Sequence, residues 1–344
     1  IPSLGEILAL RLAIRSEAIK MKTFSSALSI VTLLLSLSAM PSLAKERIAS
    51  AGGTLTDIIF ALGAGDQLLA VDTSSTSPAA AANKASIGYY RSLSAESLIA
   101  TGATELWALE GTGPAATLSQ LRNTGIKVEH FAKPRDLAEL YEFIGLLGAK
   151  LQKEAAATAL INQIKQSLPV LPATKTEVKP LSALFVLQAS SRGVIVAGSE
   201  TVPDLLFHYS AMQNLATHNG FKPISAEFLM LQQPDLLVVP EHVAQSAGGL
   251  NAFCQLPELR MLAAAKDCRV LVMDSLLSMG MTSRIGEAIQ QLYQFGQQTA
   301  LTPATSQSRL AQPSATRVNL KDTAGVNSGT DTGLQKTAKH ALGQ

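Results

Sequence analysis

The sequence lacks the local patterns of several common functions. Its formal net charge is only +2 and no run of five basic residues occurs, so nothing indicates a nucleic-acid partner. Neither the G-x-G-x-x-G motif of dinucleotide sites nor the G-x-S-x-G motif of serine hydrolases is present, which disfavours these two enzyme classes. His130, His242 and His340 are not spaced as ligands of one metal ion.

The overall composition is that of a globular protein that buries a core. Hydrophobic residues make up 47% and charged residues 16% of the 344 residues, which is ordinary for a folded chain and leaves room for two domains.

The stretch from residue 21 to residue 44 has the layout of a secretory signal peptide. Lys22 precedes an apolar run through Leu33 and Leu35, and small residues lead up to Ala44. The run is shorter than the ~20 residues of a membrane-spanning helix. We therefore predict export with cleavage after Ala44. Residues 1–20 precede the better start at Met21 and are interpreted as a non-native upstream extension. The residue directly after the predicted cleavage point is Lys45 and not cysteine, which argues against a lipid anchor.

The far end of the chain also differs from the body. Residues 301–344 are rich in Thr, Ser, Gly and Ala and show no apolar periodicity, so we predict a disordered tail. The folded body then covers about residues 45–300.

Within the body, short apolar runs alternate with helical patterns. The runs predicted as strands are residues 47–52, 68–72, 105–110, 127–132, 181–188, 235–241 and 269–274. Such alternation predicts an α/β fold with parallel sheets covered by helices.

A repeat suggests that the body has two similar halves. "GYYRSLSAESLIATGATELWAL" begins at Gly88, and "GFKPISAEFLMLQQPDLLVV" begins at Gly220. Each segment contains a glycine, an aromatic residue, a Ser-Ala-Glu triplet, an apolar helix and a buried strand. Duplication explains this match better than chance does. We therefore predict two Rossmann-like α/β lobes.

Two helices are predicted between the lobes. Residues 136–148 form an amphipathic pattern ended by glycine, and residues 151–168 form a second one that stops at Pro169. A helix of ~18 residues spans ~27 Å, enough to cross from one lobe to the other. The predicted domains are a first lobe at 45–150, a single bridging backbone helix at 151–172 and a second lobe at 173–300.

Tyr89 and Arg91 carry the chemical hypothesis. In an extended loop, residues two apart project to the same side, so the Arg91 guanidinium is expected to reach the Tyr89 phenol and lower its pKa. A phenolate is a hard donor suited to ferric iron, and tyrosine is one of the axial ligands of haem. The alternative left open by these residues is that Tyr89 and Tyr90 cover the sheet edge while Arg91 is solvated.

The two cysteines, Cys254 and Cys268, also leave an alternative open. A disulfide between them is favoured in an oxidising compartment, although two buried thiols would give the same sequence.

Several segments together resemble the periplasmic haem-binding proteins that deliver haem to ABC importers. These are "RIASAGGTLTDIIFALGAGDQLLAVDTSSTSP", "GYYRSLSAE", "EGTGPAATLSQLRNTGI", "GFKPISAEFLMLQQPDLLVVPE" and "SMGMTSRIGEAI". The resemblance covers nearly all of residues 45–300. It implies the two-lobe fold of the cobalamin and siderophore binders, with a single backbone helix, in the periplasm. It also implies capture of ferric haem without chemistry on the ligand, so no enzyme activity is expected.

The resemblance assigns roles to individual residues. Tyr89 matches the tyrosine that ligates the haem iron, Arg91 matches its hydrogen-bonding partner, and Arg284 matches an arginine near the haem. Glu96 and Glu227 match the two surface acids that dock on arginines of the permease. The implied partners are the permease and ATPase of an ABC importer and, indirectly, an outer-membrane haem receptor.

Other ligands on the same fold are the main alternative. A siderophore binder is expected to place several Arg and Trp side chains in its cleft, and the sequence has one tryptophan, Trp107. A cobalamin binder stays open, whereas the sequence shows no His and carboxylate cluster for a metal ion. Some haem-binding relatives carry a histidine where this chain reads Ala189-Ser190-Ser191-Arg192, so one bound haem is expected here. An exported haem-modifying enzyme ranks lowest.

Overall fold

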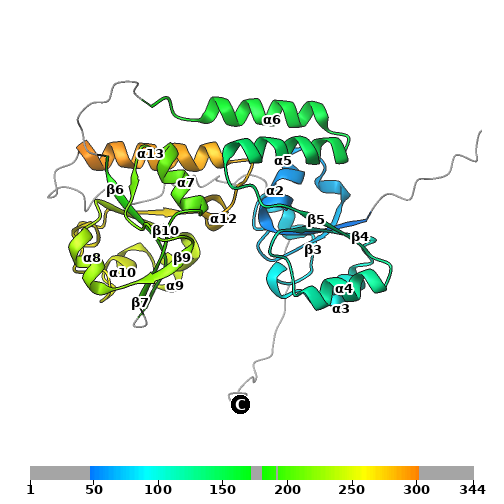
Figure 1. Cartoon of the computed structure of the whole chain (residues 1–344), viewed down its shortest axis with the longest axis horizontal. Coiled ribbons are helices and arrows are strands. Elements are labelled where there is room, and N and C mark those ends of the chain that lie inside the picture. Colours follow the sequence, from blue (N-terminus) through cyan, green and yellow to red (C-terminus); the bar gives the residue numbers. More distant parts are fainter. Residues whose placement is uncertain (1–46, 172–179, 191–192, 302–344) are drawn as a thin grey trace, which may run out of the picture.

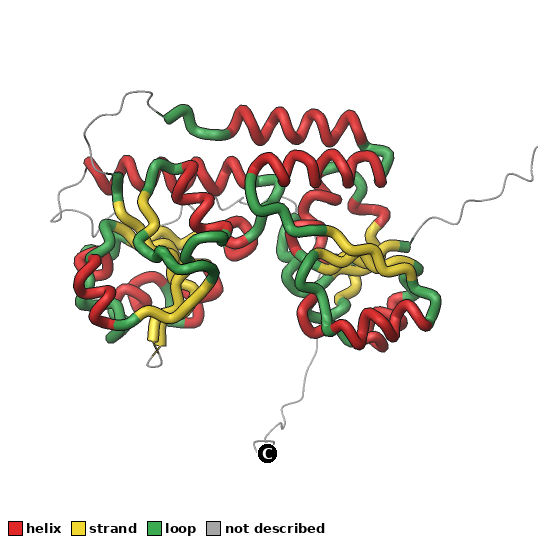
Figure 2. Tube along the Cα trace, in the orientation of Figure 1, coloured by secondary structure: helices red, strands yellow, loops and turns green. Residues whose placement is uncertain are grey.

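The structure, a computed structural model, describes residues 47–171, 180–190 and 193–301. The predicted upstream extension, the predicted signal peptide and the predicted tail beyond residue 301 lie outside the described residues. The described chain forms two α/β lobes side by side, beneath a shared layer of helices (Figures 1 and 2). The predicted two-lobed α/β fold is thus confirmed.

The first lobe is built on a five-stranded sheet in which every neighbouring pair is parallel. In spatial order its strands are β3 (Ala85–Ser86), β2 (Leu68–Val71), β1 (Ile48–Ala51), β4 (Glu105–Leu109) and β5 (Lys127–Phe131). Its helices are α2 (Gly53–Ala61), α3 (Ala95–Thr101) and α4 (Ala115–Asn123). Both β1 and β4 are buried along their whole length, as expected of parallel strands covered on both faces.

The second lobe has a mixed sheet. Its strands in spatial order are β9 (Phe221–Ile224), β7 (Gly193–Ala197), β6 (Ser182–Ser190), β10 (Leu236–Pro240) and β11 (Val270–Met273), with β8 (Gln213–Asn214) also paired to β6. The sequence predicted a parallel sheet, and this prediction is wrong for β7, which runs antiparallel to β6 and to β9. Only two residues separate β6 from β7, and so short a link can join only antiparallel strands.

The remaining helices belong to the second lobe or to the helix layer. They are α7 (Val202–Tyr209), α8 (Ala226–Gln232), α9 (Glu241–Ser246), α10 (Leu250–Cys254), α11 (Ala263–Lys266), α12 (Ser275–Met279), α13 (Ile285–Leu301), α5 (Leu137–Lys150) and α6 (Glu154–Ser167).

The two sheets share one order of strands. Apart from β8, each sheet contains five strands, which can be counted in their order along the chain. From one edge of the sheet to the other, they lie in the order third, second, first, fourth and fifth. The helices that carry the repeated Ser-Ala-Glu triplets, α3 and α8, both lead from the third of these strands to the fourth. This equivalence of position supports the duplication inferred from the repeat.

The helix layer consists of α5, α6 and α13 (Figure 1). Gly148 does not end α5, which continues to Lys150. Instead, a Cβ at Gly148 would lie 2.5 Å from Ala157, so this glycine lets α6 approach α5 closely. At its other end α6 passes Gly286 of α13, where a Cβ would clash with Ser167. The helix α6 therefore packs on α5, which follows the last strand of the first sheet, and on α13, which comes after the last strand of the second.

The lobes are joined by a continuous core as well as by helices. One apolar cluster includes Leu55 and Ile144 of the first lobe together with Phe207, Leu277 and Ile289 of the second. Such a shared core opposes large independent motion of the lobes.

The two cysteines are bonded to each other. Cys254 ends α10 and Cys268 lies shortly before β11, with Cα atoms 5.6 Å apart. The disulfide that the sequence favoured is the arrangement in the structure. It ties α10 to the edge of the second sheet.

Candidate functional site

The site is centred on the carboxyl ends of the strands, where open α/β sheets bind their ligands. There the segment after β1 in the first lobe meets the segment after β11 in the second. A Cβ at Gly53 would lie 2.8 Å from Leu276, which shows how closely α2 and α12 approach. Deeper in the contact, the backbone N–H of Ser283 donates to the Asp57 carboxylate at 2.7 Å.

A buried carboxylate fixes the loops of the first lobe at this edge. Asp72 directly follows β2 and accepts hydrogen bonds from the backbone N–H of Gly52 and from the hydroxyls of Ser74 and Ser75. The next residue, Thr73, donates its N–H to the carbonyl of Gly88. The loop that carries the two tyrosines is therefore anchored to the first sheet.

The tyrosine loop turns tightly after Gly88, which has φ +84°, a left-handed conformation that favours glycine. Tyr89 is extended, and Tyr90–Ser92 form a 3₁₀ turn in which the N–H of Ser92 bonds back to the carbonyl of Tyr89. The Tyr89 side chain is 46% exposed. The Tyr90 ring packs against the apolar cluster of the first lobe.

Arg91 pairs mainly with Tyr90 in the structure, and its interaction with Tyr89, the pair that the sequence predicted, is the weaker of the two. The Nε–H of Arg91 donates to the Tyr90 phenol at 2.8 Å, and the guanidinium lies 5.3 Å from the centre of that ring. The 3₁₀ turn removes the two-residue alternation on which the expected pairing depended. Tyr89 instead meets Tyr90 edge to face, with the ring centres 5.0 Å apart.

The electrostatics of the loop also differ from the prediction. Partial burial, with the neighbouring Tyr90 phenol as the next cause, raises the pKa of Tyr89, and the charge of Arg91 only partly offsets this. The expected lowering of the Tyr89 pKa is thus not found, and its phenol is protonated near neutral pH. The hydrogen bond to Tyr90 raises the pKa of Arg91. Burial, with the nearby Arg91 charge as a second cause, lowers the pKa of Lys133.

Lys133 is a residue of this edge that sequence analysis missed. It follows β5, and its backbone N–H donates to Glu110 at the end of β4. Its position directly after a strand end was the signal that could have revealed it. With Arg91 it brings a second cation close to the tyrosine loop.

Arg284 lies at the junction of the lobes, directly after Ser283. Its guanidinium forms ion pairs of 3.6 Å with Asp274, which follows β11, and with Glu287 on α13. Its buried Nε has no hydrogen-bond partner. Asp57, missed by sequence analysis, lies within the field of this charge, but burial is the larger influence and raises the pKa of Asp57.

Glu96 and Glu227 occupy matching positions, one in each lobe. Each is exposed in the first turn of its helix, α3 or α8. Ser94 and Ser225 cap the two helices through their hydroxyls, as the capping interpretation of the triplets predicts. Hydrogen bonds from its own backbone and from Ser225 lower the pKa of Glu227.

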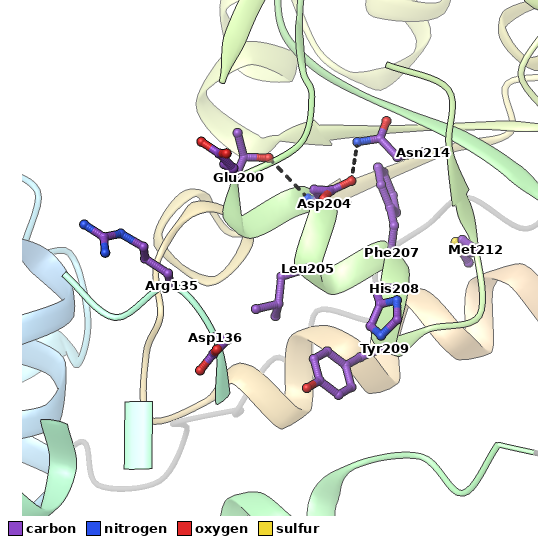
Figure 3. Close-up of a pocket in the computed structure, with 11 residues that line it drawn as sticks. Arg135, Asp136, Glu200, Asp204, Leu205, Phe207, His208, Tyr209, Met212 and Asn214 are labelled. Carbon is purple, nitrogen blue, oxygen red and sulfur yellow. Dashed lines mark hydrogen bonds between the residues drawn. The ribbon is translucent and has the colours of Figure 1, made fainter. Parts of the chain in front are cut away.

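A separate cavity of about 520 Å³ lies between the start of α5 and α7 (Figure 3). Arg135 and Asp136 come from the first lobe, and Asp204 and His208 come from the second. Asp204 already accepts a hydrogen bond from Asn214. Its lining mixes these charged groups with apolar side chains such as Leu205 and Phe207, and the structure shows no assigned role for it.

Two features are absent from residues 47–171, 180–190 and 193–301. These residues contain no group of three His, Cys, Asp or Glu side chains placed to hold a metal ion. None of their helices has the length and apolarity needed to cross a membrane.

Comparison with known proteins places the chain in a family. The model of the family described as periplasmic binding protein matches residues 48–277. The solved periplasmic haem-binding protein HutB of Vibrio cholerae is 32% identical, covers 76% of this chain and 100% of its own, and superposes with a TM-score of 0.65. The periplasmic haem-binding protein RhuT from Roseiflexus sp. RS-1, solved in its apo form, is 29% identical. The match covers 74% of this chain and 99% of RhuT, with a TM-score of 0.67.

A curated relative binds a different ligand. The vitamin B12-binding protein of Vibrio vulnificus strain YJ016 is 26% identical over 230 residues, which are 66% of this chain and 81% of the relative. Proteins of this class bind solutes and deliver them to ABC permeases, and the class does not consist of enzymes. The chain belongs to the periplasmic binding protein family, in the class whose members bind haem or vitamin B12.

Proposed function

We propose that this protein is a periplasmic carrier that captures ferric haem and hands it to the permease of an ABC importer for haem and iron uptake. The observation that carries the proposal is Tyr89, a half-exposed phenol on an anchored loop at the carboxyl edge of the first sheet. A carrier needs a strong donor that is accessible to the ligand and held by a rigid frame. The haem-binding relatives support this choice of ligand.

Tyr89 is the proposed axial ligand of the iron. Its phenol is neutral before the ligand arrives, because the ordinary pKa of tyrosine is 10.0 and partial burial raises it further. Ferric iron favours the phenolate, so coordination displaces the phenolic proton into solution. The positive charge of Arg91 favours the same anionic form from its place beside Tyr90. Arg91 therefore supports the phenolate by its field, while its hydrogen bond holds Tyr90 in place.

The propionates of haem require cations nearby. Arg284 is the proposed partner from the second lobe, where Asp274 and Glu287 hold its guanidinium in position. Lys133 is the proposed partner from the first lobe, because its partly buried ammonium gains from an anion placed next to it. One haem is expected. Its iron is bound by Tyr89 of the first lobe, and its propionates by Lys133 of the first lobe and Arg284 of the second.

Handover is assigned to Glu96 and Glu227. Both are exposed, one on each lobe, and both are held by a serine at the start of a short helix. Charged groups in such matched positions suit arginines of a permease. The export signal predicted at residues 21–44 is consistent with a periplasmic location.

Cobalamin is the second candidate ligand, because a vitamin B12-binding protein is among the relatives. The two candidates make different demands on the site, since a phenolate suits the ferric iron of haem. The test is an absorption titration of residues 45–300 with ferric haem and, separately, with cyanocobalamin. Saturable 1:1 binding of haem that excess cobalamin does not displace supports the proposal. Saturable binding of cobalamin alone replaces haem with vitamin B12 on the same scaffold.

A further inference from the structure

Each of the two proposed docking glutamates is followed, one helical turn later, by an exposed apolar side chain. Glu96 is followed by Ile99 on α3, which is 42% exposed, and Glu227 is followed by Met230 on α8, which is 49% exposed. Residues three apart on a helix lie on the same face. Each helix therefore presents a carboxylate and an apolar side chain together.

The two pairs are equivalent by sequence and by topology. Glu227 lies 131 residues after Glu96, and Met230 lies 131 residues after Ile99. Both helices connect the third main strand of their sheet to the fourth. In Figure 1 they lie in the parts of the two lobes away from the layer of α5, α6 and α13. Both lobes thus carry a carboxylate and an apolar side chain at matching positions, and α8 in addition exposes Leu231, which is 82% exposed.

The charge at these surfaces is fixed by the fold. Ser94 donates its hydroxyl to the Glu96 carboxylate at 2.9 Å. Hydrogen bonds from its own backbone N–H and from Ser225 lower the pKa of Glu227. Both carboxylates are therefore held by hydrogen bonds at the start of their helices, beside their apolar neighbours. A partner that matches this surface has a basic group next to an apolar pocket, and it has that combination twice.

We propose that Ile99 and Met230 are docking residues for the permease, each filling an apolar pocket beside a basic side chain on the periplasmic face of that membrane protein. The inference rests on the proposed function and extends it. The carboxylates attract and align the partner, whereas the two apolar side chains supply buried contact area after docking. Isoleucine and methionine differ in shape, so the flexible methionine adapts to a pocket formed by an equivalent subunit.

The experiment substitutes each apolar residue by glutamine, which keeps the helix and removes the apolar surface. The variants are Ile99→Gln, Met230→Gln and the double variant. The matched control is Leu146→Gln on α5, because Leu146 is 48% exposed but lies in the helix layer. Affinity is measured for the permease–ATPase complex of the cell's own haem importer in lipid nanodiscs. Haem affinity and the sedimentation coefficient are measured on the same samples.

Each single variant is expected to weaken docking about tenfold through lost apolar burial, and the control is expected to dock like the parent. Unchanged docking by the double variant, with the parent binding normally, overturns the roles of Ile99 and Met230 and leaves the proposed function standing. Failure of the parent itself to dock overturns this inference together with the proposed partner. The inference is also overturned if the sedimentation coefficient shows that the parent is a dimer and the double variant a monomer. Ile99 and Met230 would then be covered by a second copy of this chain instead of the permease.

Discussion

The state of Tyr89 before binding makes haem affinity depend on pH in a defined direction. Burial raises the pKa of Tyr89 above the ordinary value of 10.0, so the free protein carries the phenolic proton at every pH from about 6 to 9. Coordination releases this proton, and each unit of rising pH then favours the bound state about tenfold. Affinity that depends on Tyr89 therefore increases about 100-fold over two pH units.

The assay is a set of haem titrations at constant ionic strength, run for the parent and for Tyr89→Phe at each pH. Ionisation of haem itself affects both proteins equally, so the difference between their pH profiles reports Tyr89. Tyr90→Phe is the matched control, since it removes a neighbouring phenol and keeps the proton of Tyr89. Equal pH slopes for the parent and Tyr89→Phe refute the proton release, and with it the phenolate as ligand.

Three further predictions concern stability and transport. Asp57→Ala leaves the buried N–H of Ser283 without its acceptor at the lobe contact. It is expected to lower the free energy of unfolding, measured in urea, by about 1–3 kcal/mol. Asp57→Asn keeps an acceptor and is expected to lower it less at pH 7. Burial raises the pKa of Asp57 in the folded protein above 3.8, so the folded state loses its proton less readily than the unfolded chain. The parent is therefore expected to lose stability relative to Asp57→Asn as pH rises through the folded-state pKa. A gain in stability over that range would contradict the raised pKa. Removing the Cys254–Cys268 bond, which closes a separation of 14 residues, is expected to cost about 3 kcal/mol; an unchanged calorimetric midpoint disproves this. Glu96→Ala with Glu227→Ala is expected to leave haem affinity unchanged and to abolish uptake in a transport assay, and normal uptake rejects the docking roles.

The strands were predictable where both faces are buried. All seven predicted runs overlap a strand of the structure. Continuous apolar segments such as Leu236–Pro240 are typical of covered parallel strands. The edge strand β9, Phe221–Ile224, was missed because it is largely exposed and contains Pro223. Its partner β7 was missed together with the antiparallel hairpin.

The candidate site was predictable in its residues and not in their pairing. The motif indicated Tyr89 and Arg91, and the structure places both on one anchored loop. Which phenol Arg91 meets depends on a single 3₁₀ turn, and no residue in the loop specifies that turn against an extended chain. The contact between Asp57 and Ser283 joins residues 226 positions apart, and no local pattern could have predicted it.

Gly148 shows how one residue supports two interpretations. Glycine after an amphipathic stretch is the usual sign of a helix end. Here the missing side chain serves the approach of Ala157 on the next helix, and α5 continues past it. Distinguishing the two roles requires knowledge of which helix packs against which.

Whether Tyr89 ligates ferric haem is decided by the absorption spectrum of the haem-loaded parent beside those of Tyr89→Phe and Tyr90→Phe. We expect a phenolate-to-iron charge-transfer band in the parent and in Tyr90→Phe, and its loss, with greatly weakened binding, in Tyr89→Phe. An unchanged band and affinity in Tyr89→Phe would assign the iron to another donor.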